Sequence, residues 1–133
     1  MPISPANYTA NVNHQLGIVA QAQRQWAAAE GYYQQALAIY VEFNDRYSQA
    51  STLGQLGLLA EAREQWPAAA GYLLQALVIF RDSRDEHSLG IAIRGLARVW
   101  QSSGDATLPA RVAAVLGASE AAVVESFGRA GDQ

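Results

Sequence analysis

The sequence lacks cysteine and carries few charges. None of its 133 residues is cysteine, which excludes disulfides, thiolate metal sites and a cysteine nucleophile. Only 16% of the residues are charged while 50% are hydrophobic, a balance that argues against disorder. The formal net charge is −3, whereas a nucleic-acid-binding domain is expected to be basic. The composition therefore indicates one compact domain with a real core and no nucleic-acid partner.

Long apolar runs and a secretory leader are also missing. No stretch approaches the roughly 20 apolar residues that span a bilayer. The opening MPISPANYTA has neither a basic region nor an apolar run, so it does not resemble a signal peptide. We therefore expect no membrane contact and a cytoplasmic location, with which the missing cysteines are consistent.

The chain does contain an internal repeat. Residues 15–48 and 55–88 are identical at about half of their positions, at an offset of 40 residues. A third, partial copy starts at Leu96, where Leu16 and Leu56 recur. Self-similarity at a period of about 20–50 residues is typical of solenoids and arrays.

Apolar spacing and turn residues predict helices in each copy. Turn signals occur at Asn44-Asp45 and at Arg84-Asp85, and Gly104 is suited to end a helix. These boundaries predict about seven helices. They span about residues 6–24, 27–44, 46–65, 67–84, 86–103, 108–116 and 119–128.

Two further features concern helix starts and helix contacts. Ser4 and Pro5 are suited to the N-cap and the first position of the first helix. Gly17 lies inside that helix, where glycine costs about 1 kcal/mol relative to alanine. It recurs as Gly57, so we expect the missing side chain to let a neighbouring helix approach closely.

The recurring residues resemble the tetratricopeptide repeat, a helix–turn–helix unit of about 34 residues. That family has leucine-glycine in the first helix, an aromatic residue at the junction, and small residues with an alanine-leucine pair in the second helix. The matching residues here are Leu16, Gly17, Ala20, Trp26, Ala29, Tyr33, Ala36 and Leu37, and then Leu56, Gly57, Ala60, Trp66, Ala69, Leu73, Ala76 and Leu77. The period of about 40 residues resembles the longer variety found in arrays of bacterial multidomain signalling proteins.

The resemblance implies an all-α fold, a right-handed α-solenoid of antiparallel helix pairs in a single domain, residues 1–133. About 2.5 repeats are expected, at residues 6–44 and 46–84 and, in part, 86–117. A C-terminal capping helix pair would then end with a helix over about 119–128. Apolar residues at an open end of such a stack would favour a homo-oligomer.

The family lines its concave face with the first helix of each pair, and the resemblance implies which residues lie there. The predicted binding residues are Asn11, His14, Gln15, Ile18, Gln21, Ser51, Gln55, Leu58, Glu61, Ile91, Arg94, Arg98 and Gln101, and Gly54 and Gly95 are expected on the same face. Amides, small residues and a few apolar ones suit an extended peptide or a partner helix.

The leading hypothesis is therefore a non-catalytic protein–protein interaction scaffold that binds a peptide or partner helix in this groove. It would be a fragment of a larger signalling or regulatory protein. The alternative is a ligand-sensing regulatory module of a multidomain nucleotide-switch or transcription regulator. Both predict a partner other than nucleic acid or membrane.

Arg94 and Arg98 leave two interpretations open. They lie four residues apart on one helix, so both point the same way and could hold a carboxylate. The favoured interpretation is that they are solvated, or paired with acids of the preceding repeat such as Glu61 and Glu64.

Catalytic and metal sites are not expected. Asp85-Glu86-His87 offers metal-ligand types, but it falls at a helix start, where acids complement the helix dipole. The sequence contains no nucleophile elbow and no glycine-rich phosphate loop. Residues 110–127 have some likeness to a DNA-reading helix–turn–helix, but residues 120–127 carry two glutamates and no basic residue. We therefore predict no enzyme activity, no cofactor and no metal.

Overall fold

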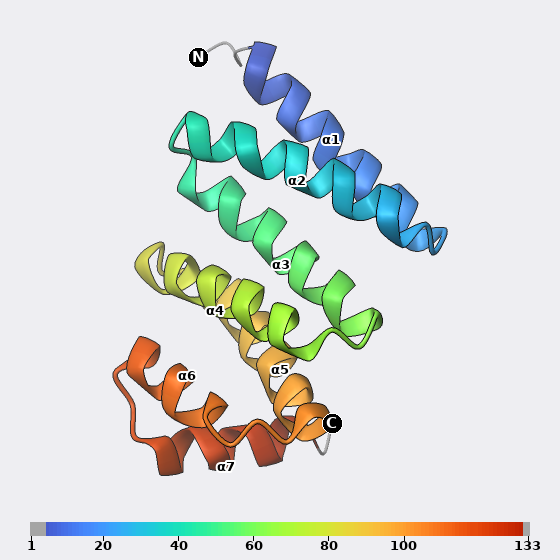
Figure 1. Ribbon diagram of the computed structural model, residues 1–133. Coiled ribbons are helices and arrows are strands. Elements are labelled where there is room, and N and C mark those ends of the chain that lie inside the picture. Colours follow the sequence, from blue (N-terminus) through green and yellow to red (C-terminus); the bar gives the residue numbers. More distant parts are fainter. Residues whose placement is uncertain (1–4, 132–133) are drawn as a thin grey trace.

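The computed structural model describes residues 5–131 and consists of stacked helices (Figure 1). Within these residues there is no strand, which confirms the all-α helical solenoid. The predicted N-cap Ser4 lies outside the described residues. The helices are α1 (Pro5–Ala22), α2 (Trp26–Glu42), α3 (Arg46–Ala62), α4 (Trp66–Asp82), α5 (Glu86–Ser103), α6 (Leu108–Leu116) and α7 (Glu120–Gly131).

Four turns of the same form connect α1 to α5, and they end each helix slightly earlier than predicted. In each turn one non-glycine residue adopts a left-handed conformation, and these residues recur every 20 positions. They are Arg24 (φ 59°), Asn44 (φ 55°), Glu64 (φ 57°) and Arg84 (φ 56°). The next amide then bonds back to the helix, as Gln25 N does to the Ala20 carbonyl at 2.9 Å. This Schellman closure satisfies helix-end carbonyls and offsets the strain of a side chain at positive φ.

Successive helices form pairs that stack along the chain. The helices α1 and α2 pack together, as do α3 and α4, and each second helix also contacts the first helix of the next pair. Figure 1 shows this order from α1 at the top to α6 and α7 at the bottom. The first helices α1, α3 and α5 contact one another in turn, so they share one face of the stack, here called the α1–α3–α5 face. Trp26 and Trp66 begin α2 and α4, and each is partly buried against the core.

Two glycines allow the helices of a pair to come close. A Cβ atom at Gly17 would lie 2.5 Å from Cε1 of Tyr33, and one at Gly57 would lie 2.7 Å from Cγ of Leu73. Both distances are shorter than van der Waals contact, so neither position has room for alanine without movement. The recurrence of glycine thus has the packing reason that the sequence predicted.

The helices α6 and α7 cover the C-terminal end of the stack, α6 against α4 and α7 against α5. Phe127 of α7 is fully buried, and its ring centroid lies 5.4 Å from that of Trp100. Gln101 Nε2 donates a hydrogen bond to the Phe127 carbonyl at 3.1 Å. The helix α5 packs more extensively on α7 than on the next helix in the chain, unlike α1 and α3, while α6 lies against α4.

Candidate functional site

The α1–α3–α5 face contains an open hollow of about 180 Å³. It lies between α3 and α5, with α1 at one edge and buried side chains of α4 as its floor. Burial lowers the pKa of the one histidine in its lining below the ordinary value of 6.5, so the lining is uncharged at neutral pH. The lining residues are His14, Ser51, Gly54, Gln55, Leu58, Leu73, Phe80, Ser88, Ile91 and Ala92.

The hollow exists because residue 54 has no side chain. At the repeat offset of 40 residues, the equivalent residues are His14 in α1 and Arg94 in α5, both of which have long side chains. A Cβ atom placed at Gly54 would meet no atom within 4 Å. Larger residues at this position therefore have space, and they would occupy the hollow rather than disturb the core.

The His14 ring fills the corresponding place at the junction of α1 and α3. Its Nδ1 lies 2.9 Å from Oγ1 of Thr52, which is fully buried, and its ring centroid lies 5.7 Å from that of Tyr33. At the junction of α3 and α5 the equivalent residues are Gly54, Ala92 and Leu73. The side chains at the α3–α5 junction are smaller or less polar. They therefore leave open the space that His14 occupies at the α1–α3 junction.

Six of the predicted concave-face residues come together around the hollow, one of them being Gly54. They are His14, Ser51, Gly54, Gln55, Leu58 and Ile91. Sequence reasoning missed four lining residues, namely Leu73, Phe80, Ser88 and Ala92. A signal for the floor was present, because Leu73 and Phe80 stand where the first copy has Tyr33 and Tyr40.

Other predicted residues contribute to packing. Gln21 Oε1 accepts a hydrogen bond from the Tyr33 hydroxyl at 2.7 Å, and Asn11 Oδ1 accepts one from the Tyr40 hydroxyl. Burial raises the pKa of Tyr33 to about 12, so this hydroxyl remains a donor at physiological pH. Two further predicted residues, Gln15 and Ile18, are exposed on α1 and lie outside the hollow lining.

The two arginines of α5 differ in their partners. Arg98 forms a bidentate ion pair with Glu61, with Nε 2.6 Å from Oε1 and Nη2 3.2 Å from Oε2. Arg94 is exposed and forms no ion pair within residues 5–131. Its Nη1 lies above Gly90, 3.4 Å from where a Cβ atom would be. The paired interpretation thus holds for Arg98, while Arg94 leaves a positive charge uncompensated.

The acidic cluster at the start of α5 serves as a helix cap. Asp85 accepts hydrogen bonds from the Ser88 amide at 3.0 Å and from the Tyr47 hydroxyl at 2.5 Å. The bond from Tyr47 is the main reason that the pKa of Asp85 is lowered to about 2. In the described part of the chain no three histidine, aspartate or glutamate side chains are grouped to hold a metal ion. Nor does any helix there combine the length and apolar character needed to cross a bilayer.

The repeated helices also match a known protein family. A sequence profile described as tetratricopeptide repeat matches residues 8–82, more than half of the chain. The protein belongs to the tetratricopeptide repeat family. Tetratricopeptide repeats generally mediate protein–protein interaction, and proteins of the family are typically non-catalytic scaffolds. No curated protein and no solved structure matches the chain.

Proposed function

We propose that this tetratricopeptide repeat protein is a non-catalytic scaffold that binds a segment of a partner protein across the α1–α3–α5 face. The hollow beside Gly54 is the observation that carries the proposal. Its volume of about 180 Å³ is smaller than the roughly 300–1,000 Å³ of pockets that enclose drug-sized ligands. A space of this size suits one side chain of a bound peptide or helix, which favours a scaffold over a small-ligand sensor.

The lining of the hollow supports an apolar anchor residue. Leu58, Ile91, Leu73 and Phe80 supply apolar surface, and burying one apolar side chain there would contribute about 1.5–3 kcal/mol. Gln55, at the edge of this apolar surface, can both donate to and accept from a peptide backbone. The anchor would supply affinity, and the polar side chains would orient the segment.

Selection from a phage library of random dodecapeptides tests this function. Peptides selected on the wild-type protein are then measured against Gly54→His, because the equivalent His14 already fills the corresponding space in the first pair. We expect affinity to fall at least about tenfold when the anchor loses its space. The matched control is Gly31→His on the exposed part of α2, where a Cβ atom also meets nothing within 4 Å. Equal binding by wild type and Gly54→His would contradict the proposal.

The wider setting is also a proposal. We infer that the chain belongs to the longer variety of repeat, as in arrays of bacterial multidomain signalling proteins, and acts in the cytoplasm as part of a larger regulatory protein. The regular 20-residue interval between turns supports the longer repeat. A thermal-shift screen distinguishes the ligand-sensing alternative from the scaffold, because a bound metabolite would raise the melting temperature.

Self-association is a second candidate function, favoured by one stripe of α1. Tyr8, Val12, Leu16 and Val19 are 67%, 40%, 40% and 52% exposed. In α3 the residues equivalent to Leu16 and Val19 are Leu56 and Leu59. They are covered by α2 and are only 1% and 2% exposed. An α1 stripe paired with that of a second copy would bury the same kind of surface. Light scattering at two concentrations should then show a dimer that Leu16→Glu dissociates, whereas a wild-type monomer at both concentrations would refute it.

A further inference from the structure

The charge beside the hollow indicates what kind of segment binds there. We propose that the partner segment carries an acidic side chain within about one helical turn of its apolar anchor, and that Arg94 binds this carboxylate. The inference rests on the proposed function and narrows it to a class of segment, acidic and apolar together.

Arg94 is not part of the lining of the hollow, but it lies close in the sequence to a residue that is. It lies three residues after Ile91, which lines the α5 wall, so the two side chains are neighbours on one helix face. Its Nη1 extends back above Gly90, the residue next to Ile91. A segment whose apolar side chain contacts Ile91 therefore brings its neighbouring residues within reach of the Arg94 guanidinium.

Arg94 has no ion-pair partner among residues 5–131. Arg98 is neutralised by its bidentate pair with Glu61, and the lining of the hollow carries no formal charge at neutral pH. An exposed guanidinium without an ion pair thus lies beside an uncharged lining, although the whole chain carries a formal charge of −3. Guanidinium groups bind carboxylates through charge-assisted hydrogen bonds, so an acidic neighbour is favoured and a basic one is disfavoured.

An internal acidic residue fits the site better than a chain terminus. The hollow is an open depression lined from α1, α3, α4 and α5, so a segment can continue past it in both directions. A terminal carboxylate would have a single arginine as its cationic partner among the residues near the hollow. Peptides with both ends blocked therefore separate the two sources of a carboxylate.

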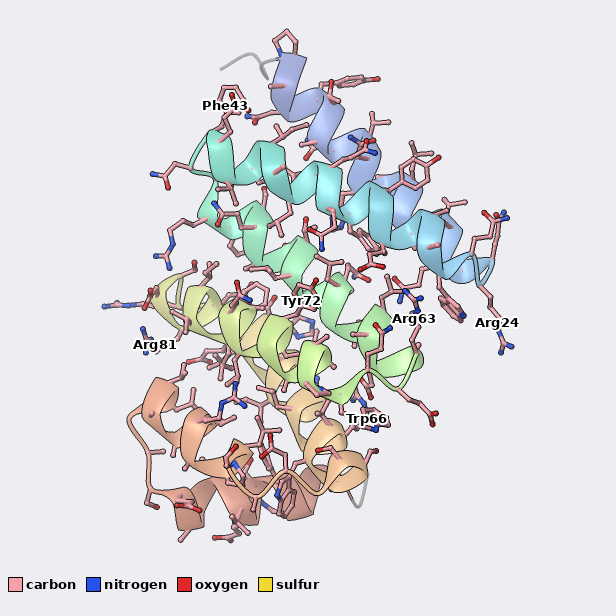
Figure 2. All side chains as sticks on the ribbon, viewed as in Figure 1. Arg24, Phe43, Arg63, Trp66, Tyr72 and Arg81 are labelled. Carbon is pink, nitrogen blue, oxygen red and sulfur yellow. The ribbon has the colours of Figure 1, made fainter. Side chains whose placement is uncertain are left out.

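Synthetic peptides chosen from the phage selection, acetylated and amidated at their ends, provide the test. Each is compared with a copy in which glutamate becomes glutamine or aspartate becomes asparagine. We expect this change to weaken binding to the wild-type protein about threefold to tenfold, and to change binding to Arg94→Gln by less than about twofold. The control is Arg24→Gln, which removes the same charge from a side chain that projects away from the stack at the α1–α2 turn (Figure 2). It should behave like the wild type.

Several outcomes would overturn the inference, and they are distinguishable from failure of the proposed function. Selected peptides without an acid near an apolar residue would refute it, as would equal losses on wild type and Arg94→Gln. If such peptides still lose binding on Gly54→His, the hollow remains the binding point and only the acidic preference fails. If no peptide depends on Gly54, the proposed function and the inference fail together.

Discussion

The first two helix pairs have the same backbone arrangement, but they place different side chains on or beneath the α1–α3–α5 face. In both, a glycine of the first helix receives a large side chain of the second, and identical turns close each helix. In the first pair two tyrosine hydroxyls bond to α1, and His14 fills the junction with α3. In the second pair Leu73 and Phe80 replace the tyrosines, and Gly54 leaves the hollow. The shared features therefore build the stack, and the few differing side chains decide where it can bind.

The largest effect is expected where both pairs agree. Gly17→Ala should lower the free energy of unfolding by about 1–3 kcal/mol, because the new Cβ atom would lie 2.5 Å from the Tyr33 ring. Gly57→Ala should act in the same direction but less strongly, since the Leu73 side chain can rotate away more easily than a ring. Urea denaturation measures both. Wild-type stability for Gly17→Ala would show that the helices do not approach as closely as described.

A moderate loss of stability is expected at a position where the first helix pair is polar and the second is apolar. Tyr33→Phe removes the hydroxyl that donates to Gln21, and should lower the free energy of unfolding by about 0.5–1.5 kcal/mol. The neighbouring Tyr32→Phe is the control, because within residues 5–131 the Tyr32 hydroxyl forms no hydrogen bond. Equal stability of the two variants in urea would mean that the tyrosine bonds do not hold the first pair together.

A small gain is expected at the glycine that opens the hollow. Gly54→Ala should raise the free energy of unfolding by about 0.5–1 kcal/mol, because alanine favours the helix and its Cβ atom has space. The sign is opposite to that for Gly57→Ala, three residues away on the same helix. A loss of stability at Gly54 in the same urea series would indicate hidden contacts and would contradict the open hollow.

The smallest effect concerns pH at the filled junction. Burial lowers the pKa of His14 below 6.5, so the unfolded chain takes up this proton more readily than the folded chain. The stability that His14 contributes is present above pH 6.5 and is lost as the pH falls toward the lower folded pKa. The urea midpoint should therefore fall further between pH 7.5 and pH 5.5 for the wild type than for His14→Gln. The same dependence in both proteins would exclude His14 as its source.

Much of the fold could be predicted from the sequence, because the same residue types recur at equivalent positions in both copies of the repeat. The helices and the glycine contacts followed from residues that recur at an offset of 40, such as Gly17 and Gly57. The helix ends were placed too late, since the turns at Arg24 and Glu64 use left-handed residues that are not glycine. Side-chain type alone does not mark such positions, because the Schellman bonds around them supply the stability.

The site was only partly predictable. The positions of Ser51, Gln55 and Ile91 on one face were implied by the family resemblance, and in the structure these residues lie around one hollow. The hollow itself depends on the missing side chain at Gly54 and on a floor from α4, so it forms only when α1, α3, α4 and α5 pack together. Likewise, the sequence allowed Arg98 either to bind a carboxylate of a partner or to pair with an acid of the preceding repeat. In the structure Arg98 is paired with Glu61.

Mapping a bound peptide by NMR on isotope-labelled protein tests the central claim most directly. With a peptide from the phage selection, we predict that the largest backbone shift changes fall at Ser51–Leu58 and Ser88–Ile91, with smaller ones near His14. Shift changes confined to the outer stripe of α1 or to the exposed side of α2, with none around Gly54, would contradict the account.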